Sequence, residues 1–182
     1  MSDDGHIHLR VVGVPVGQGS KSAMRAGDRI VVLEGKSAEG RRRHRDWRDA
    51  VSDCARRWMA DNPQALLDEP IIVTARFLFQ KPKSKPRWKW LVDVTPDVDK
   101  LARSVLDSLT GVLLRDDSLV VLLAVGKRYV TGEPPGVEID VWPCGADERE
   151  SAPVEVLLSL EPPNSTPRLV VDGVGAAEGL LP

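Results

Sequence analysis

The chain of 182 residues is 42% apolar and 29% charged. These fractions are ordinary for one globular domain and exclude a collagen-like or wholly disordered chain. The longest strongly apolar run, residues 119–125, is far shorter than a bilayer span, so we expect no membrane segment. The amino terminus lacks the basic and apolar regions of a secretory signal, so we expect a cytoplasmic protein. Its two cysteines, Cys54 and Cys144, match no metal-ligand spacing.

The formal net charge of −2 taken alone argues against a nucleic-acid partner, but the charge is unevenly distributed. Residues 143–182 contain seven acidic and two basic side chains. The remaining residues therefore carry a net charge of +3, and their basic side chains are gathered in blocks. A partner that carries phosphate groups is compatible with this pattern.

The first half of the chain predicts a strand, a helix and a second strand. Residues 7–14 alternate and are β-branched, which favours a strand, whereas the short apolar run 29–33 could be a strand or an ordered loop. Residues 46–61 repeat apolar side chains at helical spacing, and an Asn-Pro pair ends the helix. Residues 71–79 alternate again and predict a strand. The apolar face of the helix consists of Trp47, Val51, Cys54 and Trp58.

The second half predicts an exposed loop, a helix and a hairpin. Prolines interrupt residues 81–90, which favours a loop. Thr95 and Pro96 open a helix over residues 98–109, in which Leu101, Val105 and Leu109 are buried. Residues 119–125 predict a buried strand that extends to 130, and residues 137–141 predict its return strand.

The order of these elements predicts an α+β domain, with a small mixed β-sheet and two main helices packed on it. We expect the domain to occupy residues 1–142. Residues 143–182 are rich in proline, glycine and acids, and predict a mostly disordered acidic tail with a short extended piece near residues 154–158.

Two pairs of aspartates lie at the starts of successive elements: Asp97 and Asp99 open the second helix, and Asp116 and Asp117 open the strand that follows. A helix and the next strand usually pack side by side, so we expect the two pairs to meet. Clustered carboxylates repel one another unless an arginine or a divalent cation compensates. Carboxylates with retained waters suit Mg²⁺, which assists phosphodiester hydrolysis.

A simpler interpretation of the aspartates needs no metal. Asp97 and Asp99 could complement the helix N-terminus, while Asp116 and Asp117 could form a solvated turn. A calcium loop that begins at Asp97 is excluded, because it would need glycine and glutamate at the positions of Ala102 and Ser108.

Three blocks around these aspartates resemble, in order and near spacing, the RusA-type Holliday-junction resolvases, particularly those of bacteriophages. The blocks are residues 96–103 (PDVDKLAR), 106–110 (LDSLT) and 115–118 (RDDS). Weaker similarity covers residues 13–21, 81–84 and 126–127. The resemblance spans roughly residues 7–142 and leaves the tail uncovered.

This resemblance implies a homodimeric, Mg²⁺-dependent endonuclease that binds four-way DNA junctions and nicks two strands symmetrically, with roles in recombination and repair. The metal ligands would be Asp97, Asp99 and Asp117. Lys100 replaces the family's asparagine, and Arg103 replaces its catalytic lysine. Arg103 retains a cation that can stabilise developing charge, but arginine cannot donate a proton as lysine can.

Two basic blocks could contact DNA. Residues 81–90 combine five cations with two tryptophans, which suits phosphate contacts and stacking on unpaired bases, although a solvated loop explains them equally well. Residues 41–45 (RRRHR) precede the predicted first helix and carry the same ambiguity. Under the resemblance Gln18, Lys21 and Lys127 also face DNA. The loop cations are Lys81, Lys83, Lys85, Arg87 and Lys89.

Residues 13–22 lack the spacing of a phosphate-binding loop, so we expect no nucleotide cofactor. His6 and His8 could chelate a metal, but exposed terminal histidines explain them more simply. Two alternative functions stay open. One is a non-catalytic branched-DNA-binding protein in which Lys100 and Arg103 neutralise the aspartates, and the other is a general flap or single-strand nuclease.

Overall fold

The computed structural model describes residues 5–19, 21–26, 29–34 and 37–144, with side chains given for 5–19 and 37–144. The tail predicted for residues 143–182, including the short extended piece near 154–158, lies outside the described residues from position 145 onward. The described part contains a four-stranded sheet, a two-stranded hairpin and two α-helices. The predicted α+β class is therefore confirmed.

The four-stranded sheet is mixed. Its strands are β1 (Ile7–Val12), β4 (Ile71–Gln80), β5 (Val120–Val130) and β6 (Gly136–Pro143), in the order β1-β6-β4-β5. β6 pairs antiparallel with both β1 and β4, whereas β4 and β5 are parallel. The parallel pair requires the connection that carries the second helix. β1 and β5 consequently form the two edges of the sheet.

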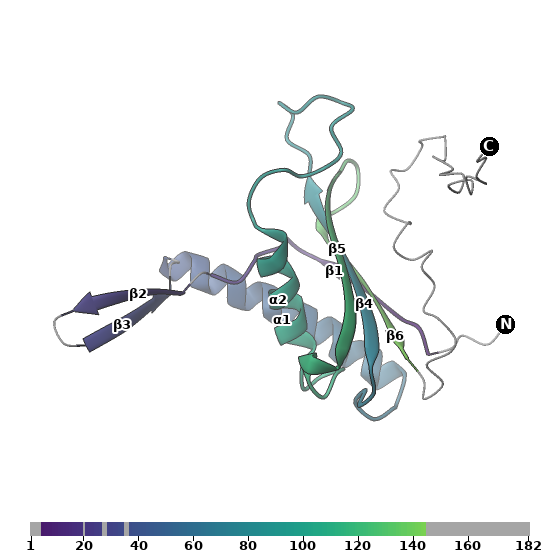
Figure 1. The fold of residues 1–182 in the computed structure, drawn as a ribbon. Helices are drawn as coiled ribbons and strands as arrows, with labels where there is room; N and C mark the ends of the chain where they lie inside the picture. The colour runs from purple at the N-terminus through teal and green to yellow at the C-terminus, as the bar shows by residue number, and fades with distance from the viewer. Residues whose placement is uncertain (1–4, 20, 27–28, 35–36, 145–182) are drawn as a thin grey trace, which may run out of the picture.

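The helices α1 (Ala38–Asp61) and α2 (Val98–Leu109) lie on the same side of the sheet, as Figure 1 shows. The short hairpin of β2 (Lys21–Ala26) and β3 (Arg29–Glu34) projects away from this body. The apolar run at 29–33 is thus a strand rather than a loop. A short 3-10 helix, η1 (Asp117–Leu119), precedes β5.

The core forms between the helices and the inner face of the sheet. α2 has the predicted bounds and buries the predicted Leu101, Val105 and Leu109. β4 is central and largely buried, with Phe77 and Leu78 fully inaccessible to solvent. α1 buries Trp47 and Val51 as predicted, while Cys54 and Trp58 are partly buried.

α1 begins at Ala38, eight residues earlier than predicted, so the basic block at 41–45 lies inside the helix and not before it. Ser37 caps this end, where its side-chain oxygen accepts a hydrogen bond from Gly40 N at 3.1 Å. The first two turns are rich in arginine. Arginine is a good helix former, but these turns have no helical repeat of apolar residues that would reveal the helix in the sequence.

The prediction that residues 119–125 form a buried strand is wrong in one respect. β5 is a strand, but it lies at the edge of the sheet, and its first half is exposed. Val121, Leu122 and Leu123 expose 63%, 36% and 39% of their surface. An apolar run has the same appearance in the sequence whether its strand is central or peripheral.

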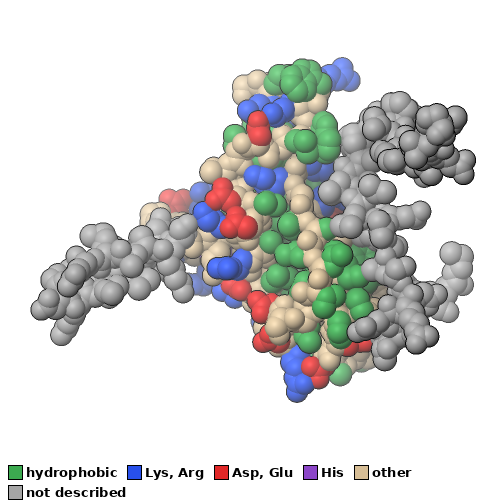
Figure 2. All heavy atoms as spheres, in the orientation of Figure 1, with side chains coloured by type: hydrophobic (Ala, Val, Ile, Leu, Met, Phe, Trp, Pro, Cys, Tyr) green, Lys and Arg blue, Asp and Glu red, His purple; other side chains and the backbone are tan. Residues whose placement is uncertain are grey.

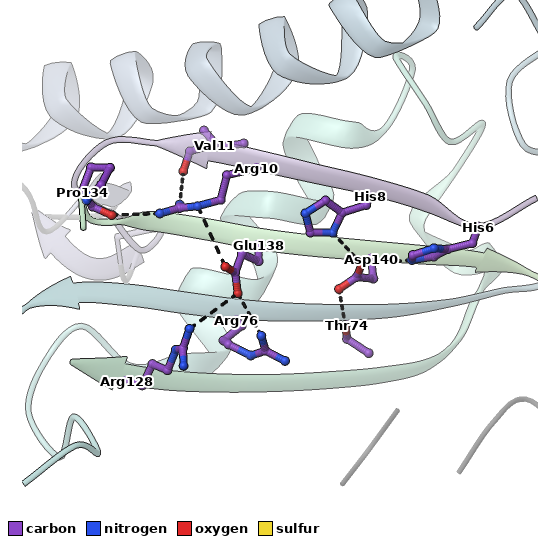
Figure 3. A network of polar contacts seen from close by, with 10 residues as sticks. All are labelled: His6, His8, Arg10, Val11, Thr74, Arg76, Arg128, Pro134, Glu138 and Asp140. Carbon is purple, nitrogen blue, oxygen red and sulfur yellow. Dashed lines mark hydrogen bonds and ion pairs between the residues drawn. The ribbon is translucent and has the colours of Figure 1, made fainter. Parts of the chain in front are cut away.

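The outer face of the sheet, opposite the helices, carries a polar network (Figure 3). Glu138 on β6 lies 2.9 Å from Arg76 and 4.0 Å from both Arg10 and Arg128. Guanidinium groups on β1, β4 and β5 thus compensate the charge of this one half-buried carboxylate.

His6 and His8 both contact Oδ1 of Asp140, at 3.0 Å and 2.7 Å, and His6 also stacks on Trp142 (Figure 3). These histidines therefore connect β1 to β6 rather than standing free at the chain end. Among the described residues, neither helix combines the length and apolar character of a membrane span.

Candidate active site

Asp97 and Lys100 form the first feature of the site, at the amino end of α2. Asp97 occupies the N-cap position of α2, but its carboxylate does not cap the helix. Oδ2 of Asp97 instead accepts a hydrogen bond from Lys100 Nζ at 2.6 Å. This hydrogen bond and the charges of Lys100 and Lys127 lower the pKa of Asp97, so the carboxylate is ionised.

Asp99 and Arg103 lie on the same helix, one turn apart, and both are exposed. Neither side chain makes a hydrogen bond or ion pair with any described residue. The charge of Asp99 acts on Lys100, whose pKa is raised by its hydrogen bond to Asp97 and by both aspartates. α2 therefore presents two carboxylates and two cations to solvent within its first two turns.

Lys127, near the end of β5, holds the segment that leads into Asp97. Its Nζ donates hydrogen bonds to the carbonyl oxygens of Val94 at 2.8 Å and Pro96 at 2.9 Å. Two of its three donors are thus used inside the protein. Lys127 was expected to face DNA, but its contacts are those of a residue that positions Asp97.

A cleft of about 510 Å³ opens beside Asp97 and Lys100, between α1, α2 and the segment after β1. Gly17 allows that segment to approach α2 closely, because a Cβ at Gly17 would lie only 3.0 Å from Cβ of Lys100. Gln18 N donates to Lys100 O at 2.9 Å. The cleft is lined by Val14, Pro15, Val16, Gly17, Gln18, Gly19, Ser37, Gly40, Arg43, Thr95, Pro96, Asp97 and Lys100.

The side chain of Gln18 packs against α2 and does not extend into solvent. Its Nε2 lies 3.3 Å from Oδ2 of Asp107, and its Oε1 is buried with no hydrogen-bond partner among the described residues. Arg43 of α1 is exposed at the cleft wall. The side chain of Lys21, which belongs to β2, is outside the described part of the structure.

The basic loop at residues 81–90 stands beyond the end of β4, at the same end of the sheet as Asp97. Lys81 Nζ donates to Arg87 O at 2.7 Å, so this cation stabilises the loop itself. Lys83 and Arg87 are exposed, and Trp88 exposes 77% of its surface. Lys85 is half-buried, and Lys89 pairs with Asp93 at 2.6 Å.

Asp117 lies at the other end of the sheet, so the expectation that the two aspartate pairs meet is wrong within one chain. α2 runs away from Asp97 for twelve residues, about 18 Å at 1.5 Å per residue, before the turn that leads to Asp117. β5 then returns past α2, and its seven steps from Val120 to Lys127 cover about 23 Å. A helix start therefore neighbours the end of the next strand, not its start.

Asp116 and Asp117 differ in what their carboxylates do. Oδ1 of Asp116 accepts a hydrogen bond from Ser118 N at 2.9 Å and caps η1, and its bonds to Ser118 lower the pKa of Asp116. Asp117 is exposed, and its carboxylate makes no hydrogen bond or ion pair with a described residue. Of the two, Asp117 is the one that is available to a ligand.

The donor chemistry of Asp97, Asp99 and Asp117 fits a hard cation, because exposed carboxylate oxygens leave positions for water and phosphate. Their placement in one chain does not fit, since ligands of one Mg²⁺ lie about 2.1 Å from it. Across the described residues of a single chain, no group of three His, Cys, Asp or Glu side chains lies close enough to hold a metal ion.

An exposed carboxylate pair beside a cleft, with cations on the adjoining helix and loop, is compatible with a ligand that carries phosphate groups. Comparison with known protein families matches residues 13–142 to the family described as endodeoxyribonuclease RusA, over more than two thirds of the chain. The chain therefore belongs to the RusA family and is an endonuclease that acts on DNA. Comparison with individually curated proteins finds no match.

Family membership confirms the resemblance of the three sequence blocks and argues against the non-catalytic alternative. Sequence reasoning named Lys100 and Arg43 but did not place them at the site. Lys100 was expected to neutralise the aspartates only in the non-catalytic alternative, and its i, i+3 spacing from Asp97 is the signal of the observed ion pair. Arg43 lines the cleft because α1 begins early, and no local signal revealed that start.

Proposed function

We propose that this endonuclease resolves four-way DNA junctions by paired symmetric nicks, as a Mg²⁺-dependent homodimer. The observation that carries the proposal is the pair of exposed carboxylates of Asp97 and Asp99 at the edge of a cleft. The exposed side chain of Arg43 lines the same cleft. Junction resolution would serve DNA recombination and repair, in the cytoplasm of a bacterial host if the gene belongs to a bacteriophage.

Asp97, Asp99 and Asp117 are the proposed metal ligands. When bound there, Mg²⁺ would polarise the phosphate and lower the pKa of an attacking water. Arg103 lies one turn beyond Asp99 and is exposed, so its guanidinium can approach the developing charge on the phosphate. Lys127 keeps the segment before Asp97 in place.

The basic loop supplies the proposed contacts to DNA beyond the site. Exposed Lys83 and Arg87 suit phosphate oxygens, and the exposed ring of Trp88 suits stacking on an unpaired base at the junction. Lys81 and Lys85 are both half-buried, so they stabilise the loop or contact DNA more weakly than Lys83 and Arg87 do. Gln18 and Lys21 remain proposed DNA contacts from the segment beside the cleft and from β2.

The test uses a panel of end-labelled substrates: a four-way junction, a flap, a linear duplex and a single strand, each with Mg²⁺ or with a chelator. We expect paired nicks in the four-way junction alone, and only with Mg²⁺. Asp99→Asn should abolish nicking while the gel shift of the junction is retained. Nicking by that variant, or nicking in the chelator, would contradict the metal assignment.

The same panel separates the remaining alternative. A general flap or single-strand nuclease would cut the flap or the single strand as fast as the four-way junction. Equal rates on these substrates would overturn junction resolution while leaving the endonuclease assignment intact.

A further inference from the structure

A cluster of arginines on the outer face of the sheet carries more positive charge than its one carboxylate balances. Glu138 lies 4.0 Å from Arg10, 2.9 Å from Arg76 and 4.0 Å from Arg128. Three guanidinium groups and one carboxylate leave an excess of two positive charges in this outer arginine cluster (Figure 3). The four side chains expose only 18–29% of their surface, so solvent screens this excess incompletely.

Arg128 is poorly satisfied within the cluster. Its Nε is buried without a hydrogen-bond partner among the described residues, and its ion pair with Glu138 spans 4.0 Å. Asp140, two residues further along the same face of β6, contacts His6 and His8. The cluster therefore has capacity for a further anion.

No described helix or strand covers this face of the sheet. Both helices lie on the opposite side, and the β2–β3 hairpin projects away (Figure 1). Figure 2 shows that lysine and arginine side chains also gather beyond the end of β4, where the basic loop stands. An acidic partner could therefore bind at the outer arginine cluster or at the basic loop.

The chain itself supplies an acidic segment beside this face. Cys144, the last described residue, is tied to the start of β4, because its N donates to Pro70 O at 2.7 Å. Residues 145–182 contain seven acidic and two basic side chains, a net charge of −5. The first charged residues among them, 147–150 (DERE), carry a net charge of −2, equal and opposite to the excess of the cluster.

The length of the chain allows these carboxylates to reach the cluster. Glu138 lies six residues before Cys144, about 20 Å along an extended chain, and Glu150 lies six residues after it. A segment that turns back over β6 would thus reach the level of Glu138. Alternate side chains of an extended segment share a side, so Glu148 and Glu150 would face the sheet together while Arg149 faced away.

We propose that residues 147–150 dock on the outer arginine cluster, with the carboxylates of Glu148 and Glu150 beside Arg76 and Arg128. This contact holds the carboxylates on the side of the sheet opposite α1, α2 and the cleft. Without it, seven carboxylates of the same chain would compete with DNA phosphates for the cations of the basic loop. Docking therefore allows the protein to bind DNA while it carries its own acidic segment.

Limited trypsin digestion of the full chain tests the contact, because Arg149 lies inside the docked segment and Arg168 lies well beyond it. The initial rate of cleavage after Arg149 is divided by the rate after Arg168, and a synthetic peptide of residues 143–182 gives the reference ratio. Cleavage of a docked segment requires its release, so at low salt we expect the ratio to be at least about ten-fold lower in the protein than in the peptide. Equal ratios at low salt would refute the proposal.

Salt and two arginine variants identify the surface that is bound. The ratio should rise toward the peptide value in about 1 M salt, where ion pairs are screened. Arg76→Gln should raise it at low salt, whereas Arg87→Gln in the basic loop should leave it low. A rise in Arg87→Gln with none in Arg76→Gln would place the segment on the basic loop and overturn the proposal.

Substitutions in the segment keep the test decisive if Arg76→Gln unfolds, because they leave the folded domain unaltered. Glu148→Gln with Glu150→Gln, referred to a peptide with the same substitutions, should abolish the protection of Arg149. The matched control is Glu155→Gln with Glu161→Gln, which removes the same charge outside the docked segment and should retain the protection. Equal protection in both double variants would exclude docking through Glu148 and Glu150.

A disulfide tests the direction of the segment. Thr74 lies opposite Asp140 on the outer face, four residues of β6 before Cys144, and Glu148 lies four residues after it. With both native cysteines replaced by serine, oxidation of Thr74→Cys Glu148→Cys should close a loop that migrates faster on a nonreducing gel. Asp53→Cys, exposed on α1, should not close with Glu148→Cys. Closure with Asp53→Cys and not with Thr74→Cys would contradict the proposed path.

Junction DNA separates the two possible occupants of the outer face. The segment and DNA bind on opposite sides of the sheet, so a four-way junction added without Mg²⁺ should leave cleavage after Arg149 unchanged. If the junction accelerates this cleavage, DNA and the segment compete for one surface and the proposal is wrong. If Arg76→Gln leaves the ratio low but weakens junction binding, the cluster contacts DNA instead. None of these outcomes depends on the proposed metal ligands.

Discussion

The ammonium group of Lys100 lies 2.6 Å from Oδ2 of Asp97 on the first turn of α2, where the two residues form an exposed ion pair. Lys100→Asn removes this competitor of a metal ion for Asp97. We expect Mn²⁺ or Mg²⁺ to bind about two- to five-fold more tightly, the range for loss of one exposed ion pair. Calorimetric titration of the protein with either metal measures the change.

The same substitution changes the titration of Asp97. Lys100 lowers the pKa of Asp97, so their ion pair contributes stability above the unfolded pKa of about 3.9 and loses it as the pH falls through the lower folded pKa. In Lys100→Asn the pKa of Asp97 should rise toward 3.9 by NMR, with protonation starting at a higher pH. Lys89→Asn is the matched control, because it should raise the pKa of Asp93 and leave Asp97 unaltered. An unshifted Asp97 would contradict the role of Lys100.

Lys127→Met tests the positioning of Asp97. Losing the two hydrogen bonds to Val94 O and Pro96 O should reduce kcat about 10- to 100-fold, the usual effect of losing a group that orients a ligand, with little change in KM. Lys83→Met should instead raise KM and reduce the salt dependence of binding by about one phosphate contact. Steady-state kinetics at several salt concentrations separate the two. A rise in KM alone for Lys127→Met would make it a DNA contact.

Asp116 and Asp117 form a matched pair for testing the third ligand. Asp116→Asn keeps an effective cap on η1, since asparagine also accepts from Ser118 N, and should retain activity within about two-fold. Asp117→Asn should reduce cleavage by more than about 100-fold, beyond the effect of losing a ligand-orienting group. Junction cleavage rates measure both. If Asp116→Asn reduced the cleavage rate more than Asp117→Asn did, the third metal ligand would be Asp116.

Phe77→Ala should lower the free energy of unfolding by about 3–5 kcal/mol, because it leaves a cavity at a fully buried position of the central strand. Val12→Ala, at a position that exposes 58% of its surface, should change it by less than about 0.5 kcal/mol. Urea unfolding followed by circular dichroism provides both values. Similar values for the two variants would place Phe77 outside the core.

Elements with a strong local signal were predictable. α2 has its predicted bounds because Leu101, Val105 and Leu109 repeat at helical spacing. The start of α1 was missed because Ala38 is the one apolar side chain in residues 38–45, too few to reveal the helical period. The exposure of β5 was missed for a different reason: which strand forms an edge depends on pairing with β4 and β6, which are distant in the sequence.

The candidate site also has a part that the sequence could predict and a part that it could not. Asp97, Asp99 and Lys100 are neighbours on one helical turn, so their proximity follows from the sequence. The placement of Asp117 depends on the direction in which β5 returns past α2, and it puts this carboxylate at the far end of the sheet. Sequence spacing alone could therefore identify the set of aspartates but not their arrangement.

The pairing of β1 with β6 joins residues 7–12 to residues 136–141, which are separated by almost the full length of the described domain. Contacts between such distant segments close large loops and slow folding. During synthesis β1 is made first and remains unpaired until β6 follows, when nearly the whole domain has been made. The nascent chain thus carries an unpaired strand for most of its translation, and an unpaired strand is prone to aggregation.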